Sequence, residues 1–411
     1  MDITYLLANR IRQSNISKSN VSARIIKIAI LAVTIGIASI LISIAAGRGL
    51  QKAISEKTAA FNGHIVISTF ENNTSQVSVN PFMLDKQYFK LLNDLNNIYS
   101  YQKVAYKAGL IKFVDDYEGI IFKGIDSSFN QSIFSEFLIE GRFPDLDDIS
   151  SNEIIISNYT AKRLNMSLGD EPVAYFKKNN AQKIPNQRKF KVVGLYESDF
   201  SDFDEIYILG GLNQIRVLNN WSGDDVGAIE VFLKNNDDDI FTANELYKFL
   251  PYDIDVITLR SKFKNIFQWI ALFDLNILII LIIMLFVGVV NIATALLILI
   301  FERSSMIGLL KTIGASDYQI QKIFLWNGFQ IILQGVLFGN ALGLAFYFSQ
   351  KYFNWIKLDP TIYYVSTAPV ELNFFEWFLT NLSIIFVCLL LLYFPTKIIS
   401  GMSPSINIRK R

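Results

Sequence analysis

Residues 301–320 read FERSSMIGLLKTIGASDYQI and lie between two long apolar stretches of the chain. Within them, apolar side chains recur with the i, i+3, i+4, i+7 spacing of one helix face: Met306, Leu309, Leu310 and Ile313. Gly314 is a natural helix stop, and Ser316 and Gln319 have the spacing of a capping box that starts the next helix. We therefore expect a short amphipathic helix at a membrane surface, over about 302–316, on which a soluble partner could push.

The composition indicates a membrane protein with a large water-soluble part. The chain has 411 residues, of which 51% are hydrophobic and 14% aromatic, and its mean hydropathy is +0.32. Its net charge of +1 gives no reason to expect a nucleic-acid partner. The single cysteine, Cys388, cannot form an internal disulfide, the single His64 leaves no room for a His-rich metal site, and no P-loop motif occurs. We expect no metal, cofactor or catalytic residue in this chain, so any ATP and Mg that its function requires would be bound by a partner protein.

Four apolar stretches are long enough to cross a bilayer as helices. They cover about 28–47, 269–301, 324–348 and 374–394. For the first stretch a cleaved signal peptide is an alternative, since residues 45–47 resemble a cleavage site, but its length of about 20 residues favours an uncleaved anchor. In the third, Gly335, Gly339 and Gly343 recur every four residues, which favours close helix packing inside a bundle.

Basic residues give the expected orientation. They lie before the first stretch, between the second and third, and after the fourth: Arg10, Arg12, Lys18, Arg24, Lys27, Arg303, Lys311, Lys322, Lys397, Arg409, Lys410 and Arg411. The positive-inside rule places them all on the cytoplasmic side. We therefore expect a cytoplasmic N-terminal segment (1–27) and tail (395–411), with residues 48–265 and the loop 349–373 outside.

The long segment 48–265 alternates between strand-like and helix-like patterns. The strand-like runs are HIVIS (64–68), EGIIFKGI (118–125), EIIIS (153–157), KFKVVGLY (189–196), EIYIL (205–209) and AIEVFL (228–233). The helix-like runs cover 85–97, 157–164, 211–218 and 240–250. The predicted fold is an α-helical membrane protein with four transmembrane helices and an α+β periplasmic domain inserted between helices 1 and 2. Residues 48–104 and 211–265 would pair into one part, and 105–210 would form a second.

The run ERSSMIGLLKTIGA (302–315) resembles the signature ER-x-x-x-I-G-x-L-(K/R)-x-(I/L/M)-G-A of FtsX-like ABC permeases, which include the MacB, FtsX and LolC/LolE groups. Further strings resemble the lipoprotein-releasing LolC/LolE branch: FNGHIVIS (61–68), EGRFP (140–144), NEIIIS (152–157), LNMSLGD (164–170), KFKVVGLYES (189–198), NIATALLILIFERSSMIGLLKTIGA (291–315) and LDPTIYYVSTAPVEL (358–372). The resemblance implies a multi-pass permease of a bacterial inner membrane. Its outer domain would divide into a Porter-like part, about 48–104 and 211–265, and a Sabre-like part, about 105–210.

The resemblance also implies three sets of site residues. A LolD-like ATPase dimer would couple through Glu302, Arg303, Met306, Ile307, Gly308, Leu310, Lys311 and Gly314. The string KKNNAQKIPNQRKF (177–190) is similar to the Hook hairpin of LolC-type chains and the neighbouring Pad, which recruit a LolA-like carrier. Ile184 and Pro185 would lie on the Hook, and Gln187 and Arg188 would match the Pad. The acyl chains of a lipoprotein would lodge between the first and second spans of the two permease chains, lined by Ile40, Ile44, Met284 and Phe286.

The implied function is that of a permease subunit that extracts acylated lipoproteins from the outer leaflet of the inner membrane and passes them to the carrier. A second permease chain would complete the transporter, and the sequence leaves open whether the pair is a homodimer or a LolC/LolE-type heterodimer. MacB-like export, transmembrane signalling to a cell-wall hydrolase and a non-transport membrane scaffold also stay open as functions. From the residues alone, 302–316 could equally be a linker on lipid headgroups, and 177–190 a plain polar hairpin.

Overall fold

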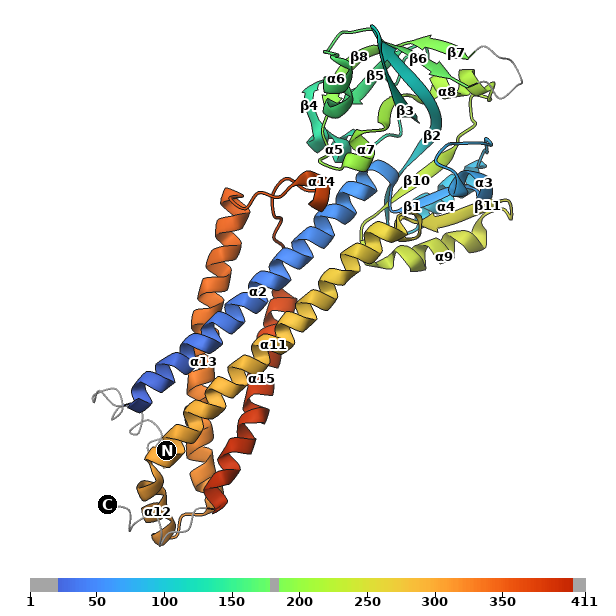
Figure 1. Ribbon diagram of the computed structural model, residues 1–411. Coiled ribbons are helices and arrows are strands. Elements are labelled where there is room, and N and C mark those ends of the chain that lie inside the picture. The colour runs from blue at the N-terminus through green and yellow to red at the C-terminus, as the bar shows by residue number, and fades with distance from the viewer. Residues whose placement is uncertain (1–20, 178–184, 402–411) are drawn as a thin grey trace. The chain divides into compact units, whose positions relative to one another are not determined.

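A computed structural model describes residues 21–177 and 185–401 of the chain, which form two compact units (Figure 1). The described residues of unit 1 lie within Met1–Lys52, Trp269–Lys357 and Thr367–Arg411. Those of unit 2 lie within Ala53–Gln268 and Leu358–Ser366. Two long helices, α2 (Val21–Asn62) and α11 (Lys264–Glu302), contribute residues to both units.

Unit 1 is a bundle of long apolar helices. Besides the unit 1 parts of α2 and α11 it contains α12 (Ser304–Thr312), α13 (Asp317–Phe353), α15 (Phe374–Thr396) and the 3₁₀ helix η3 (Lys397–Gly401). Four helices in the described part of the chain are long and apolar enough to cross a membrane, within 24–62, 264–302, 317–353 and 374–399. Each contains one of the predicted spans, whose boundaries within the membrane stay predictions.

Glycines on α13 allow α2 to approach closely. A Cβ atom added at Gly335 would lie 2.4 Å from Cγ1 of Val33. One added at Gly339 would lie 2.7 Å from Cβ of Ile37, and Gly343 faces α2 one turn further along. The expectation that these three glycines serve helix packing is confirmed.

A small polar network joins α13 to α15. The indole Nε1 of Trp377 donates a hydrogen bond of 2.6 Å to Oδ1 of Asn340. Nδ2 of Asn340 donates to Oδ1 of Asn381 at 2.7 Å. Such networks satisfy polar groups within an apolar bundle, so they fix the pairing of these two helices.

The described residues of unit 2 form a mixed sheet of eleven strands. The strands are β1 (Ile65–Thr69), β2 (Ile98–Phe113), β3 (Asp116–Ile125), β4 (Leu138–Gly141), β5 (Glu153–Ser157), β6 (Val173–Phe176), β7 (Asn186–Lys189), β8 (Lys191–Tyr196), β9 (Tyr207–Gly211), β10 (Ala228–Leu233) and β11 (Ile254–Thr258). The main path runs β11-β1-β10-β2-β3-β9-β5-β8-β4, with β6 paired to β2 and β7 to β6. The pairs β3–β9 and β5–β8 are parallel, and the others are antiparallel.

Short helices accompany this sheet (Figure 1). They are α3 (Phe70–Thr74), α4 (Lys86–Asp94), α5 (Gln131–Phe134), η1 (Ser135–Phe137), α6 (Asn158–Leu164), α7 (Ser201–Asp204), α8 (Leu212–Asn219), η2 (Asn236–Asp238), α9 (Asp239–Phe249), α10 (Leu259–Lys262) and α14 (Pro360–Tyr363). The last turns of α2 also belong to the core of unit 2. There the ring of Phe61 stacks on Phe203 at 4.8 Å and meets Phe134 edge-on at 5.0 Å.

The six strand-like and four helix-like runs all fall on observed elements, in agreement with the predicted α+β class. The long strand β2 was not predicted, because its interior carries buried polar side chains that disguise the alternation. Gln102 and Lys107 are both buried there, and Nζ of Lys107 donates to Oδ1 of Asn219. Along β2, residues 98–104 pair with β10 and residues 109–112 with β6. This change of partner falls near the proposed Porter–Sabre boundary, which stays a prediction.

Candidate coupling helix, partner-binding hairpin and apolar surface

The short helix α12 has the ends that the sequence predicts. Gly314 follows it with φ +95°, a conformation that favours glycine. The next helix begins with a reciprocal capping box. The hydroxyl of Ser316 accepts from the Gln319 backbone N–H at 3.4 Å, and Oε1 of Gln319 accepts from the Ser316 backbone N–H at 2.9 Å. The predicted stop and the predicted capping box are both confirmed.

The apolar side chains of α12 divide between two faces, which corrects the predicted single stripe. Ile307 is completely buried, and Met306 and Leu310 are half-buried against Ile323 of α13. Leu309 and Ile313 belong to the predicted stripe but are 55% and 75% exposed. The spacing predicts which residues share a face of the helix, but it does not show how much of that face a neighbouring helix covers. Here α13 covers only part of the stripe, and the remainder is exposed.

Lys311 holds α12 in place from within the unit. Its Nζ forms an ion pair with Oδ1 of Asp317 at 2.8 Å and donates to the backbone oxygen of Ile399 at 2.9 Å. The Lys311 side chain is only 11% exposed. These contacts tie α12 to the start of α13 and to η3, so Lys311 is placed to position the helix.

Of the predicted coupling residues, Glu302 and Gly314 are exposed, Arg303 is half-buried and Gly308 is buried. Their role in coupling stays a prediction. The structure adds exposed apolar candidates that the sequence did not single out as contact residues: Leu309, Ile313 and Tyr318, which is 74% exposed.

Of the predicted Hook and Pad residues, Gln187 and Arg188 lie on β7 of the β6–β7 hairpin, and Pro185 immediately precedes that strand. Ala174 pairs with Arg188 and Tyr175 with Gln187. The hairpin is anchored by Phe176, which is fully buried and meets the ring of Phe122 edge-on at 6.0 Å. At its base Glu171 and Lys189 form an ion pair at 2.5 Å. Ile184 lies outside the described residues.

Side chains on the second strand of this hairpin alternate between its two faces. Gln187 is exposed and Arg188 is half-buried, and as neighbours in a strand they point in opposite directions. A partner that binds one face would therefore contact only one of them directly. Pro185 is also exposed, and within the described residues β7 pairs with β6 alone, so its outer backbone edge is open.

The four residues predicted to line an acyl-chain surface occupy different environments. Ile40 and Ile44 are buried, 2% and 8% exposed, in the apolar core of unit 1. Met284 is half-buried against that core, whereas Phe286 is 68% exposed. Only Phe286 is freely accessible in a single chain, and the lining role of all four stays a prediction.

A loop contact that no sequence pattern predicts lies in unit 2. The ring of Tyr364, which follows α14, stacks on Phe200 at 4.4 Å. Nζ of Lys57 donates to the backbone oxygens of Ser198 at 2.7 Å and Tyr364 at 3.4 Å, and forms an ion pair with Asp199 at 3.2 Å. The segment Leu358–Ser366 is thereby held against the segment before α7.

Two family models match the chain. The MacB-like periplasmic core domain matches residues 28–245, which is more than half of the 411 residues, and the FtsX-like permease C-terminal model matches residues 278–404. The chain belongs to the FtsX-like permeases with a MacB-like periplasmic core domain. Unit 2 supplies the sheet of that domain, and α12 and α13 lie within the FtsX-like match.

Curated relatives of this permease include LolC and LolE proteins. It is 24% identical to lipoprotein-releasing system transmembrane protein LolC of Buchnera aphidicola, over 90% of each chain. It is 20% identical to the corresponding LolE of Haemophilus influenzae, over 94% of this chain and 95% of the relative. Among solved structures, the periplasmic region of MacB from Actinobacillus actinomycetemcomitans gives a TM-score of 0.36 at 16% identity, covering 49% of this chain and 91% of that one. The resemblance to LolC and LolE that the sequence suggested is confirmed.

Proposed function

We propose that this permease is a subunit of an ABC transporter that extracts lipoproteins from the outer leaflet of the inner membrane. It would pass them to a LolA-like periplasmic carrier, powered by a separate LolD-like ATPase dimer that binds the ATP and Mg. The observation that carries the proposal is the similarity to LolC and LolE over 90% and 94% of the chain. The FtsX-like and MacB-like matches support the same architecture.

The proposed orientation places both termini and α12 in the cytoplasm. The MacB-like domain, inserted between the first and second spans, lies in the periplasm. The support is the basic residues that flank the predicted cytoplasmic ends of the spans, from Arg24 to Lys397. In this orientation α12 faces the ATPase, and the hairpin of β6 and β7 faces the compartment of the carrier.

We assign the outer face of α12 to the ATPase. Leu309 and Ile313 project apolar side chains into solvent, while Lys311 connects the helix to α13 and η3. Movement of the ATPase would press on α12 and would be passed through those two contacts to the membrane helices. The chain itself carries out no covalent chemistry in this scheme.

The acyl chains of the lipoprotein would lie against the exposed face of α11, around Phe286, and against the second permease chain. Moving an acyl chain from lipid to an equally apolar protein surface costs little free energy, whereas exposing it to water costs about 0.8 kcal/mol per CH₂. Work is therefore needed when the cargo is handed to the carrier, where the hairpin of β6 and β7 would hold the acceptor close.

The function is tested with proteoliposomes that contain the full chain, its ATPase, any second permease chain and a triacylated lipoprotein. Adding ATP and soluble carrier should yield a soluble lipoprotein–carrier complex. If vesicles that are shown to contain the permease, the ATPase and the lipoprotein hydrolyse ATP but form no such complex, the proposal is overturned. Export of a small molecule would indicate a MacB-like role, and activation of a cell-wall hydrolase would indicate a signalling role. If no ATPase co-purifies with the chain, that result would indicate a scaffold.

Two variants test the assigned surfaces in the same assay. Gly308→Pro should break α12 and uncouple ATP hydrolysis from release. Arg188→Glu should weaken crosslinking to the carrier without changing ATP hydrolysis, and Lys162→Glu, an exposed lysine on α6, is its matched control. Normal release by the first variant, or normal crosslinking by the second, would reject the corresponding assignment.

A further inference from the structure

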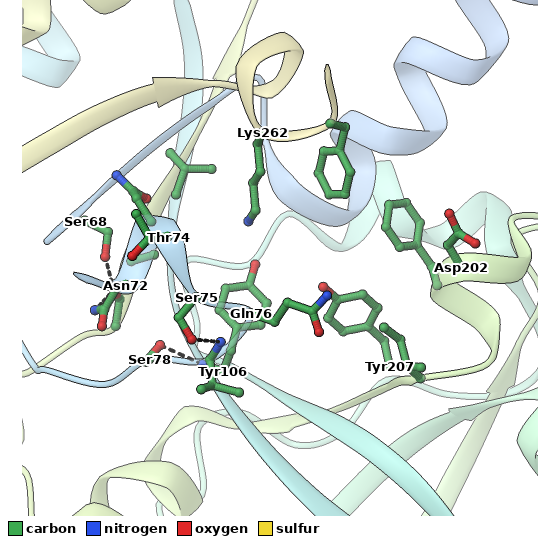
Figure 2. Close-up of a pocket in the computed structure, with 18 of the residues that line it drawn as sticks. Ser68, Asn72, Thr74, Ser75, Gln76, Ser78, Tyr106, Asp202, Tyr207 and Lys262 are labelled. Carbon is green, nitrogen blue, oxygen red and sulfur yellow. Dashed lines mark hydrogen bonds between the residues drawn. The ribbon is translucent and has the colours of Figure 1, made fainter. Parts of the chain in front are cut away.

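Unit 2 contains a cavity of about 610 Å³ that no part of the proposed transport cycle uses (Figure 2). Its walls come from β1, α3 and the loop after it, β2, α7, β9, β10 and α10. This volume lies within the range of about 300–1,000 Å³ that is typical of small-molecule sites. The cavity is therefore large enough for an amino acid or a short peptide.

A buried ion pair, Lys123 and Glu230, contacts the cavity wall through Tyr106. Nζ of Lys123 contacts both carboxylate oxygens of Glu230, at 2.9 and 2.8 Å, and the two side chains are 1% and 0% exposed. Glu230 also accepts from Nε2 of Gln102 at 2.5 Å and from the hydroxyl of Tyr106. Since Glu230 is saturated with donors, it has little capacity left to neutralise another cation.

Lys262 reaches into the cavity with most of its hydrogen-bonding capacity unused. Its Nζ makes one hydrogen bond, of 3.3 Å to Oδ1 of Asn62, and lies 5.5 Å from the centre of the Tyr106 ring. An ammonium group has three donors, so two of them find no acceptor among the described residues. Burial lowers the pKa of Lys262 to about 8, with Glu230 opposing and Lys123 adding to the shift.

A second donor converges on the same space. Tyr207 is 8% exposed, and its hydroxyl makes no hydrogen bond to another described residue. Its ring is held edge-on against Phe203 at 5.7 Å and against Tyr106 at 6.2 Å. In Figure 2 Lys262, Tyr106 and Tyr207 point toward one another in the centre of the cavity. An ammonium and a phenol with free donors form a receptor for a carboxylate.

The remaining walls narrow the ligand class. Asp202 and Glu205, both exposed, line the same cavity and favour a positively charged group. They would also repel a doubly charged anion such as phosphate. Gln76, whose amide makes no hydrogen bond to another described residue, adds a site for an amide or hydroxyl.

We propose that this cavity binds a zwitterion of the amino-acid or short-peptide class, with its carboxylate on Lys262 and Tyr207 and its ammonium toward Asp202 and Glu205. The inference does not depend on lipoprotein transport, since every residue that it uses lies in unit 2. It adds a ligand site to a domain for which the proposed function needs none.

The test uses the full-length protein in nanodiscs and a panel of the standard amino acids and alanine-based tripeptides, each tripeptide also as its C-terminal amide and its N-acetyl form. Binding is measured by saturation-transfer NMR and by calorimetry. At least one free zwitterion should bind, and its amide should bind about tenfold more weakly or worse, because the amide lacks the charge that Lys262 meets. Affinity should fall as the pH rises above 8, because Lys262 loses its proton there.

Lys262→Met and Tyr207→Phe should each weaken binding. The second variant removes a single oxygen and leaves the ring packing intact. Lys248→Met, an exposed lysine on α9, is the matched control and should bind as the parent does. Failure of the whole panel to bind, equal binding of acid and amide, or full binding by Tyr207→Phe would overturn the proposal. Preferential binding of inorganic phosphate would also overturn it.

Discussion

The helices α2 and α11 look alike in sequence and differ in what surrounds them. Each has a candidate span of 39 residues, with hydropathies of 2.7 and 2.9. Of the residues in the most apolar window, 56% are buried in α2 and only 11% in α11. The apolar surface of α2 packs inside the chain, against the glycines of α13, whereas most of the apolar surface of α11 is exposed in the single chain.

The helix α12 likewise has both buried and exposed apolar side chains, and substituting one of each should give the largest difference between two variants. Ile307→Glu would bury a charge at a position with no exposure, so we expect loss of folded protein, measured as detergent-solubilised monomer on size-exclusion chromatography. Ile313→Glu places the same charge on a side chain that is 75% exposed, and the protein should fold normally but lose ATPase binding. Equal behaviour of the two variants would mean that the two faces of α12 are wrongly assigned.

A pair of truncations tests the division between α2 and α11 directly. Ile40→Ala removes a fully packed side chain and should destabilise the bundle by about 2 kcal/mol or more, mostly through lost van der Waals contacts. Phe286→Ala removes a larger side chain that is 68% exposed and should leave thermal stability nearly unchanged, while lipoprotein release falls. Thermal unfolding of the two variants in the same detergent measures their stabilities. A larger loss of stability in Phe286→Ala than in Ile40→Ala would contradict the comparison.

The glycines offer a matched pair with opposite expected signs. In Gly339→Ala the new Cβ would lie 2.7 Å from Cβ of Ile37 and 2.9 Å from the Thr34 carbonyl, so α2 must shift at a cost of about 1–2 kcal/mol. In Gly288→Ala, on α11, the new Cβ meets nothing within 4 Å, so the helix should gain up to about 1 kcal/mol from better propensity. Melting temperatures measured side by side decide the matter, and a stabilised Gly339→Ala would remove the evidence for tight packing of α2 on α13.

The smallest effect is expected from the ion pairs that link α2 to its neighbours. Arg48 lies 3.5 Å from Asp274 of α11 and 3.2 Å from Glu376 of α15, and all three side chains are substantially exposed. Arg48→Met should therefore cost less than about 1 kcal/mol, and high salt should abolish the difference. A large, salt-independent loss would mean that charge, rather than apolar packing, holds α2 against α11.

Much of this architecture could be predicted from the sequence, for identifiable reasons. The four spans follow from long apolar runs, and the ends of α12 follow from Gly314 and from the spacing of Ser316 and Gln319. The packing role of Gly339 followed from its repeat with Gly335 and Gly343. In each case a local pattern has one dominant physical cause.

What escaped prediction depends on contacts between distant segments. Strand β2 hides its periodicity because Lys107 is buried on a partner 112 residues away. The stripe on α12 could not show which of its residues α13 covers, and nothing in the sequence links Tyr364 to Phe200. Lys262 and Tyr207 are likewise far apart in the sequence and line the same cavity only in the folded domain.

The most direct measurement is site-specific photocrosslinking in the reconstituted transporter, with a photoreactive amino acid at position 286 on α11 or at position 40 on α2. With a triacylated lipoprotein and no ATP, position 286 should crosslink to the acylated N-terminus and position 40 should not. Adding ATP and carrier should abolish the crosslink as the lipoprotein leaves. Equal crosslinking at both positions, or none at position 286 while ATP is hydrolysed, would contradict the account.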